Sequence, residues 1–266
     1  MTNPSYPGER RQYSFSLTRL LSKKKRPITK IGIVVMIIIL YAIVLQWSII
    51  NDNINWFIQA TETTAAISFI AIFMGLGLGI VIGLGRVSNN YFIHGVATVY
   101  VEALRGTPLL IQIFFIYFGL PSIGITFPDP FLPAILALGL NSAAYQAEIV
   151  RGGIQSIPKG QMEAARSTGM TYLQSMRHVI LPQAFRMIIP PMTNEYVTVI
   201  KDSSLAYTIG VFELTKEGYQ LVSVYFQPIP IFFFVALVYF TMTALTSTIM
   251  GFVEKRYRTP GYMVGG

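Results

Sequence analysis

Four long stretches of the chain contain no Asp, Glu, Lys or Arg, namely residues 31–50, 63–85, 131–147 and 229–253. A helix of about 20 apolar residues is long enough to cross the hydrocarbon layer of a bilayer, and each stretch is near or above that length. Only 12% of the residues are charged, about half the share found in soluble domains. An outer-membrane barrel would instead show alternating segments of roughly ten residues. The sequence therefore predicts an all-α polytopic membrane protein.

The composition also excludes several kinds of chemistry. Cysteine is absent, which excludes disulfides, thiolate metal sites and a cysteine nucleophile. The two histidines, His94 and His178, have no metal-ligand spacing around them. No G-x-x-x-x-G-K-[ST] loop occurs, so the chain has no phosphate-cradling loop of its own. An intramembrane enzyme would need a nucleophile with a base, or a metal cluster, and the sequence offers neither.

The basic residues predict the topology. Seventeen of the 20 Lys and Arg residues fall on one side of the membrane if six spans lie near 31–50, 60–85, 91–120, 131–150, 187–208 and 229–253. The loops on the opposite side hold only Lys216. Positive charge marks the cytoplasmic side, so both termini are predicted to be inside. The net charge of +8 is explained in this way without binding to nucleic acid.

Two spans are predicted to be irregular. The third is interrupted by Arg105-Gly106-Thr107-Pro108, and we expect an interfacial stretch up to about Leu104 and then a span opened by Pro108. The fifth begins at Pro190-Pro191 and carries Asn194, Glu195, Lys201 and Asp202.

The second span carries Gly75, Gly79 and Gly83, which share one helix face. They predict either a packed core or a dimer seam, and glycine is also simply common in membrane helices.

The cytoplasmic segment 151–186 is long for a loop and has internal order. Pro158 is placed to open a helix with Glu163 early in it, and Gly169 is placed to end that helix in a left-handed conformation. A second helix over 171–185, broken at Pro182, follows. Together the two helices predict a compact knob, and small residues at its surface would let it enter a groove on a partner. The alternative is an amphipathic helix on the lipid headgroups, which would favour Trp, Phe and Leu on one face.

The same segment resembles the EAA loop of the membrane subunits of ABC importers. That pattern reads E-A-A, three residues, Gly, nine residues, I-x-L-P. It matches Glu163, Ala164, Ala165, Gly169, Leu181 and Pro182 here, with Val179 where the family usually has Ile. The stretches 101–110, 141–153 and 200–205 narrow the resemblance to the polar amino-acid uptake branch. The resemblance covers about residues 56 to 255.

The resemblance implies a permease of the bacterial cytoplasmic (inner) membrane with a five-helix type I core, to which this chain adds one N-terminal helix. It implies no catalysis by this chain and no cofactor in it, since ATP and Mg would be bound by two ATP-binding subunits. Further implied partners are a second permease chain, identical or homologous, and an extracytoplasmic amino-acid-binding protein. Glu163, Ala164, Ala165 and Gly169 would couple the permease to the ATPase.

The resulting organisation has four parts: a basic cytoplasmic tail over 1–30, an extra membrane helix over 31–55, the transporter domain over 56–255 and a cytoplasmic tail over 256–266. The competing function is an ion-coupled secondary amino-acid transporter or channel subunit, which internal inverted repeats would support. We find no convincing repeat, and such a carrier has no need of the knob.

An amino-acid substrate needs a partner for its ammonium and donors for its carboxylate. Ionisable residues within a span usually face a bundle interior or a watery pathway, and Glu195 is the best candidate for the ammonium. The predicted substrate pathway consists of Asn194, Glu195, Asp202 and Ser203. The alternative is that Lys201 and Asp202 neutralise each other or cap the helix break. Glu102, Arg105 and Glu148 are interpreted as structural, with Arg105 pairing to a carboxylate such as Glu102, and Gln112 and Tyr117 are left undecided as cavity residues.

Overall fold

The computed structural model describes residues 47–257, and every regular element in that part is a helix. The prediction of an all-α fold is therefore confirmed for this part of the chain. The predicted tail over 1–30, the first predicted span up to residue 46 and the residues after 257 lie outside the described residues. The short helix α2 (Trp47–Asp52) is the first described element.

Two helices of the described part are long and apolar enough to cross a membrane, α3 (Ile54–Arg86) and α11 (Pro228–Tyr257). A third crossing is counted if α4 (Tyr91–Arg105) and the helix from Leu109 to Ile123 are taken together, since they are bent by 104° at the break between them. The six-span count stays a prediction, because α6 (Phe131–Gln155) and α9 (Leu181–Asp202) do not pass the same test.

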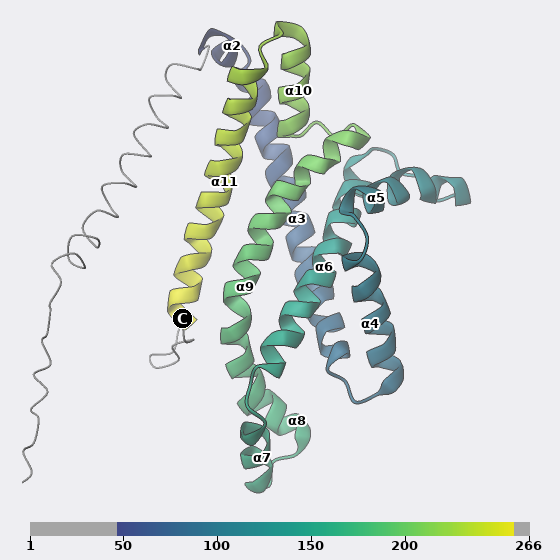
Figure 1. Ribbon diagram of the computed structural model, residues 1–266, viewed down its shortest axis with the longest axis vertical. Helices are drawn as coiled ribbons and strands as arrows, with labels where there is room; N and C mark the ends of the chain where they lie inside the picture. Colours follow the sequence, from purple (N-terminus) through teal and green to yellow (C-terminus); the bar gives the residue numbers. More distant parts are fainter. Residues whose placement is uncertain (1–46, 258–266) are drawn as a thin grey trace, which may run out of the picture. The chain divides into compact units, whose positions relative to one another are not determined.

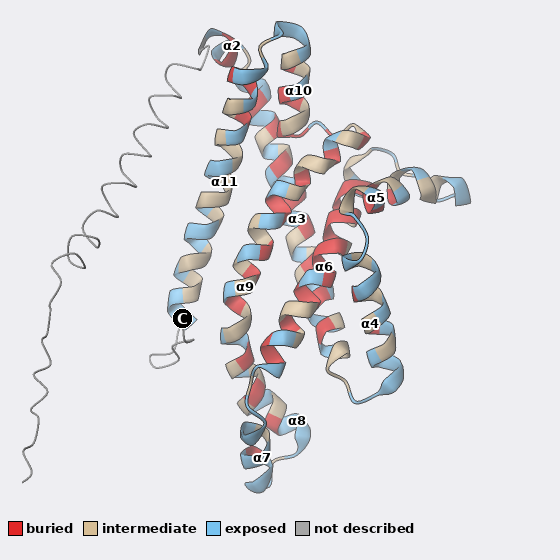
Figure 2. Cartoon of the chain, in the orientation of Figure 1, coloured by how far each residue is buried: buried red, intermediate tan, exposed pale blue. Residues whose placement is uncertain are grey.

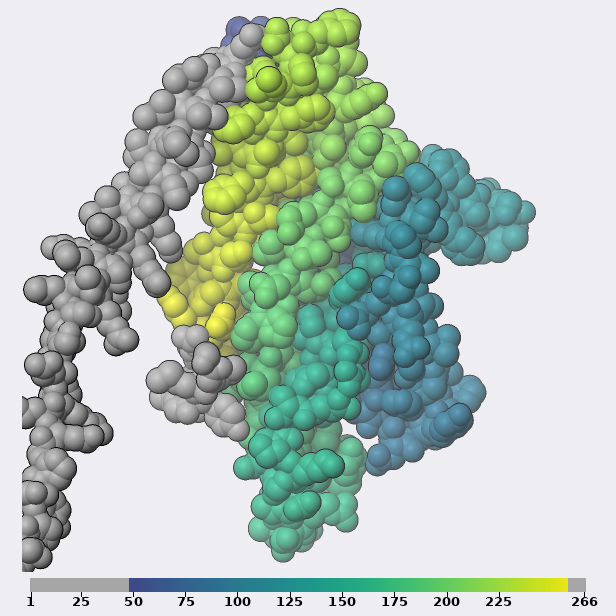
Figure 3. Space-filling model, viewed as in Figure 1, coloured from purple at the N-terminus to yellow at the C-terminus, as the bar shows by residue number. Residues whose placement is uncertain are grey.

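The predicted interruption of the third span is confirmed. The first half, α4, ends at Arg105, and Pro108 precedes α5 (Leu109–Phe114). The chain continues through a π-helical segment, η1 (Phe115–Gly119), and a 3-10 turn, η2 (Leu120–Ile123). Figures 1 and 3 show the α5 region projecting to the right of the view, away from the helices around α6. Pro108 has no N–H to continue the α4 ladder, so the chain changes direction here.

The centre of the described part is α6, which packs against α3, α9 and α4. Figure 2 shows buried residues along its length. Gly75, Gly79 and Gly83 on α3 lie against α6 so closely that an added Cβ at each would come within 2.7 Å of a side-chain atom of Gln146 or Val150. The glycine stripe is therefore a packed seam within one chain, as one of the two interpretations held, because small residues let two helix backbones approach.

A buried carboxylate joins α10 (Leu214–Tyr225) to α11. Glu213 is fully buried and accepts hydrogen bonds from the backbone N–H groups of Thr215 (2.9 Å) and Lys216 (2.8 Å). It also accepts one from the Tyr239 hydroxyl on α11 at 2.6 Å. The carboxylate thereby caps α10 and ties it to α11.

The segment predicted to form a knob consists of α7 (Lys159–Ser167) and α8 (Tyr172–Ser175), followed by the π-helical turn η3 (Met176–Ile180). Gly169 ends α7 with φ +87°, so its predicted left-handed conformation is confirmed. Thr171 and Gln174 form a reciprocal capping box at the start of α8.

One of the two predicted proline boundaries is wrong. The predicted break at Pro182 coincides with the change from η3 to α9, because α9 begins at Leu181 and Pro182 lies in its first turn, where its missing N–H costs least. Pro190 and Pro191 do not open the fifth span, because α9 begins at Leu181 and runs through them. Packing of α9 against α6 and α11 supports the helix across the lost hydrogen bonds.

Candidate functional site

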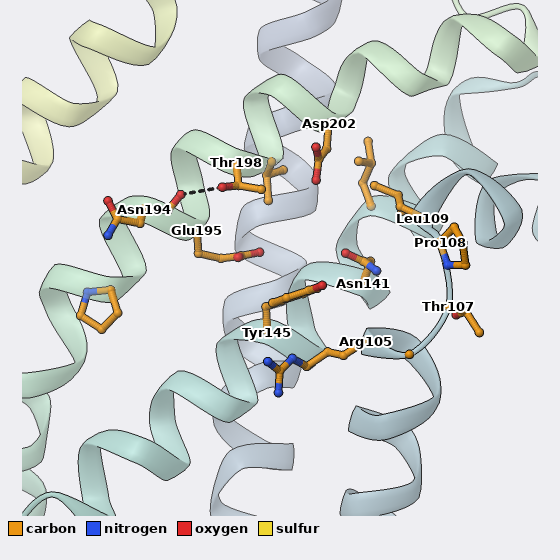
Figure 4. Close-up of a pocket in the computed structure, with 14 residues that line it drawn as sticks. Arg105, Thr107, Pro108, Leu109, Asn141, Tyr145, Asn194, Glu195, Thr198 and Asp202 are labelled. Atoms are coloured by element: carbon orange, nitrogen blue, oxygen red, sulfur yellow. Dashed lines mark hydrogen bonds between the residues drawn. The ribbon is translucent and has the colours of Figure 1, made fainter.

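A cavity of about 610 Å³ lies at the break between α4 and α5 (Figure 4). One wall is the break itself, residues 105–109. Leu138, Asn141 and Tyr145 of α6 form the second wall. The third wall belongs to α9 and comprises Pro191, Asn194, Glu195, Thr198, Val199 and Asp202. The interrupted helix thus faces an acidic helix surface across a polar space.

Glu195 is the most buried charged group of the cavity, with 9% of its surface exposed. The Ser142 hydroxyl donates a hydrogen bond to its Oε1 atom at 2.8 Å. The amide of Gln146 in turn donates to the Ser142 hydroxyl at 3.0 Å. Oε2 has no hydrogen-bond partner among residues 47–257, so one side of the carboxylate is anchored and the other is uncommitted.

Asp202 adds a second carboxylate two helical turns further along the same face of α9. It does not cap the following 3-10 helix, η4 (Ser203–Ile209), with its side chain. Within the described part of the chain it also forms no ion pair with the exposed Lys201. The interpretation in which this pair neutralises itself or caps the break is not supported by these contacts.

Arg105 supplies the positive charge. Its guanidinium carbon lies 5.1 Å from the centroid of the Tyr145 ring, a cation–π contact between two residues that line the cavity. No carboxylate among the described residues lies within ion-pair distance of Arg105, so the expected pairing with Glu102 is wrong. The reason is geometric: α4 ends at Arg105, and its side chain lies against α6 rather than along α4 (Figure 4).

Glu148, by contrast, forms the structural ion pairs expected of it. It forms a bidentate ion pair with Arg151 on its own helix, in which two guanidinium nitrogens each contact one carboxylate oxygen. Its Oε2 atom also lies 3.6 Å from Arg86 at the end of α3. These charges join α3 to α6 away from the cavity.

Three of the four predicted pathway residues line the cavity, namely Asn194, Glu195 and Asp202. Ser203 does not, because it is fully buried and donates its hydroxyl to the Ile200 carbonyl at 2.7 Å. Sequence reasoning did not identify Tyr145 or Thr198 as site residues. It interpreted Arg105 as a structural ion-pair residue and treated the rest of the break only as an interruption. An interrupted helix inside a membrane is itself the feature that points to a binding site.

The four residues of the predicted coupling surface lie on the knob, which Figure 1 places at the lower end of the view, away from the cavity. Glu163, Ala164 and Gly169 are exposed, whereas Ala165 is buried. Glu163 does not lie in the first turn of α7, so the expected interaction with the helix N-terminus is wrong. The helix begins at Lys159, which puts Glu163 in its middle, where the helix dipole acts weakly.

In the stretch from 47 to 257, no three His, Asp or Glu side chains are grouped closely enough to hold a metal ion.

Comparison with known proteins gives consistent matches. The family model described as binding-protein-dependent transport system inner membrane component matches residues 75–259. The glutamine transport system permease protein GlnP of Escherichia coli (strain K12) is 38% identical over 214 residues, which are 80% of this chain and 98% of that protein. The L-cystine transport system permease protein TcyB of Bacillus subtilis (strain 168) is 38% identical over 211 residues, 79% of this chain and 87% of that protein. The crystal structure of an amino acid ABC transporter with histidines has a TM-score of 0.73 at 38% identity and covers 78% of this chain and 96% of that one.

Proposed function

Because the chain belongs to the family of binding-protein-dependent transport system inner membrane components, we propose that its cavity at the α4–α5 break binds the amino acid in transit. The chain is the permease subunit of an amino-acid ABC importer, a transport component rather than an enzyme. Its relatives do not favour the alternative of an ion-coupled secondary carrier.

The observation that carries the proposal is the separation of opposite charges across the cavity. Glu195 and Asp202 lie on one wall and Arg105 lies on the other, and within residues 47–257 none of the three is in an ion pair. A free amino acid carries an ammonium and a carboxylate, and charge-assisted hydrogen bonds to such groups are about twice as strong as neutral ones. Glu195 binds the ammonium through its uncommitted oxygen, and Arg105 binds the carboxylate.

The remaining polar groups fit a polar or charged side chain. Asp202 offers a second carboxylate, and the exposed amide of Asn194 offers both a donor and an acceptor. Ser203 supports the end of α9 through its hydrogen bond to Ile200 and does not contact the substrate.

The knob formed by α7 and α8 is the contact to the ATP-binding subunits, which the family implies along with a substrate-binding protein. In the proposed complex, two such subunits bind ATP and Mg and dock on the exposed surface of Glu163, Ala164 and Gly169. The buried Ala165 holds α7 in place. A second permease chain, identical or homologous, completes the pathway. Closure of the ATPase moves the knobs, and the permease halves rock around the cavity.

The test is ATP-driven uptake by proteoliposomes containing this chain, its ATP-binding subunits and its binding protein. A panel of labelled neutral, acidic and basic amino acids is offered, with ATP enclosed on the side of the knob. We expect uptake of at least one polar or charged amino acid that stops when ATP is omitted. Proteoliposomes with this chain alone are the control and should be inert. Uptake by the chain alone, driven by an ion gradient, would contradict the proposal.

A further inference from the structure

One backbone carbonyl at the end of α4 lacks its usual hydrogen-bond donor. In a continuing helix, the carbonyl of Leu104 accepts the N–H of the residue four positions later. That residue is Pro108, which has no N–H. A partly buried carbonyl that is left without a donor is destabilising, so another donor is favoured at this position.

The neighbouring carbonyls are satisfied locally. The Glu102 carbonyl accepts the Gly106 N–H at 2.8 Å. The Ala103 carbonyl accepts the Thr107 hydroxyl at 2.9 Å. Leu104 is therefore the position at which the proline leaves a gap.

Gln112, one turn into α5, fills that gap. Its Nε2 atom donates to the Leu104 carbonyl at 2.7 Å. The same amide lies 3.1 Å from the Thr107 carbonyl and 2.9 Å from the Thr107 hydroxyl. Gln112 is buried and does not line the cavity. Its side chain thus replaces the donor that Pro108 lacks and clamps the start of α5 to the end of α4.

A third element fixes the orientation of this amide. Asn141 of α6 is also buried, and its Nδ2 atom donates to Gln112 Oε1 at 3.0 Å. Because the Gln112 Oε1 atom accepts this hydrogen bond from Asn141, the Nε2 atom of Gln112 points toward the break. The Asn141 Nδ2 atom also lies 3.5 Å from the Leu104 carbonyl, so side chains from α5 and α6 both act on this backbone segment.

We propose that Gln112 and Asn141 form a lock that holds the break, residues 105–108, in its bent conformation and so positions the Arg105 wall of the cavity. Gln112 is a positioning residue, because it acts on the wall and touches no substrate. The inference rests on the proposed function for its consequence in transport, but the position of the break can be measured without a substrate.

The absence of cysteine from the chain makes that measurement direct. A single cysteine is introduced at Leu109, on the break side of the cavity, or at Thr198, on the α9 side, since both positions line the cavity. Its reaction rate with a charged, water-soluble methanethiosulfonate reagent is measured in membranes. Each probe is then combined with Gln112→Met, which keeps a long unbranched side chain and removes the amide. The matched control is Ile113→Leu, a volume-conserving change at the adjacent, fully buried residue of α5.

Loss of the buried hydrogen bonds is expected to change the rate at Leu109→Cys by about tenfold. The rate at Thr198→Cys should change by less than about twofold, and Ile113→Leu should leave both rates within that margin. Unchanged rates at both probes with Gln112→Met would overturn the lock. An equal change at both probes would also overturn it, since Gln112 would then support the whole cavity rather than the break.

Asn141→Leu provides a second variant in case Gln112→Met does not accumulate in the membrane. It removes the donor to Gln112 Oε1 and a longer, 3.5 Å contact to the Leu104 carbonyl, so it should alter the same probe in the same direction but less. Because Asn141 also lines the cavity, this variant is assessed by the cysteine probes and not by uptake. The double variant should change the Leu109→Cys rate by less than the product of the two single effects, and effects that multiply would show that the two residues act independently.

Uptake measurements then separate the two proposals. We expect ATP-driven uptake to fall by about tenfold or more in Gln112→Met, because small displacements of a binding group are costly, and to survive in Ile113→Leu. A selective change at Leu109→Cys with full uptake would uphold the lock and contradict the cavity as the substrate site.

Discussion

At the scale of single residues, the two carboxylate oxygens of Glu195 differ in their hydrogen bonding. Ser142 holds one oxygen at 2.8 Å, while the other has no hydrogen-bond partner within residues 47–257. A carboxylate that served structure alone would have both oxygens satisfied, because a buried charge left without partners is costly. Glu195 lines the same cavity as Arg105.

Glu195→Gln tests this residue, since it keeps the shape and the hydrogen bond from Ser142 but removes the charge. Loss of a charge-assisted hydrogen bond of about 1.5–3 kcal/mol should weaken uptake by roughly tenfold or more. The complex should still assemble and hydrolyse ATP. Glu102→Gln is the control, because Glu102 is exposed on α4 and does not line the cavity. Equal uptake by both variants across a substrate titration would make Glu195 structural.

At the scale of elements, the knob depends on the turn between α7 and α8. An added Cβ at Gly169 would meet nothing within 4 Å, but its φ of +87° is strained for any residue with a side chain. Gly160 in α7 has the same open surroundings without a positive φ. The two glycines therefore separate backbone strain from side-chain bulk.

Gly169→Val should reorient the knob, since a left-handed residue with a Cβ costs about 1–2 kcal/mol, and its side chain would also occupy the docking surface. Membrane insertion should persist, while uptake is lost and ATP-binding subunits are retained weakly. Gly160→Val, which adds the same side chain at a position without a positive φ, should leave subunit retention and uptake intact. The measurement is the number of ATP-binding subunits retained in membranes purified with each variant. Full retention together with full uptake in Gly169→Val would show that this segment is not the coupling element.

The seam between α3 and α6 allows a second comparison of this kind. An added Cβ at Gly79 would lie 2.7 Å from the Cβ of Gln146 and 3.1 Å from the Ala143 carbonyl, whereas one at Gly77 would meet nothing within 4 Å. Gly79→Ala should destabilise the protein by about 1–3 kcal/mol through overpacking. Gly77→Ala should be neutral or slightly stabilising. Thermal unfolding of the purified variants in detergent measures the difference, and equal melting temperatures would mean that the seam can relax.

At the scale of the whole molecule, the charge distribution predicts how the chain lies in the membrane. In the predicted six-span arrangement the basic residues of both tails and of the knob fall on one side, which predicts cytoplasmic termini. A reporter fused after Gly266 should therefore be active only in the cytoplasm, and one inserted in the loop over 121–130 only outside. Activity of the first reporter outside the cytoplasm would contradict the six-span arrangement.

What the sequence determined by itself was local in character. Uncharged runs predict membrane helices, the interruption before Leu109 predicts a broken span, and Gly169 predicts the end of α7, because each depends on hydropathy or on the backbone of a few neighbouring residues. The knob and its resemblance to the EAA loop were readable for the same reason. The course of α9 through Pro190 and Pro191 was not, since packing of α9 against two other helices overrides a local preference.

Only the tertiary structure decided which side chains meet. The cavity joins the break to α6 and α9, Ser142 reaches Glu195 from 53 positions away, and Asn141 reaches Gln112 from 29 positions away. Arg105 finds Tyr145 rather than Glu102 because α4 ends at that residue and the chain turns. Such contacts depend on how helices pack in space, and neither the spacing nor the polarity of a residue encodes which helix it will face.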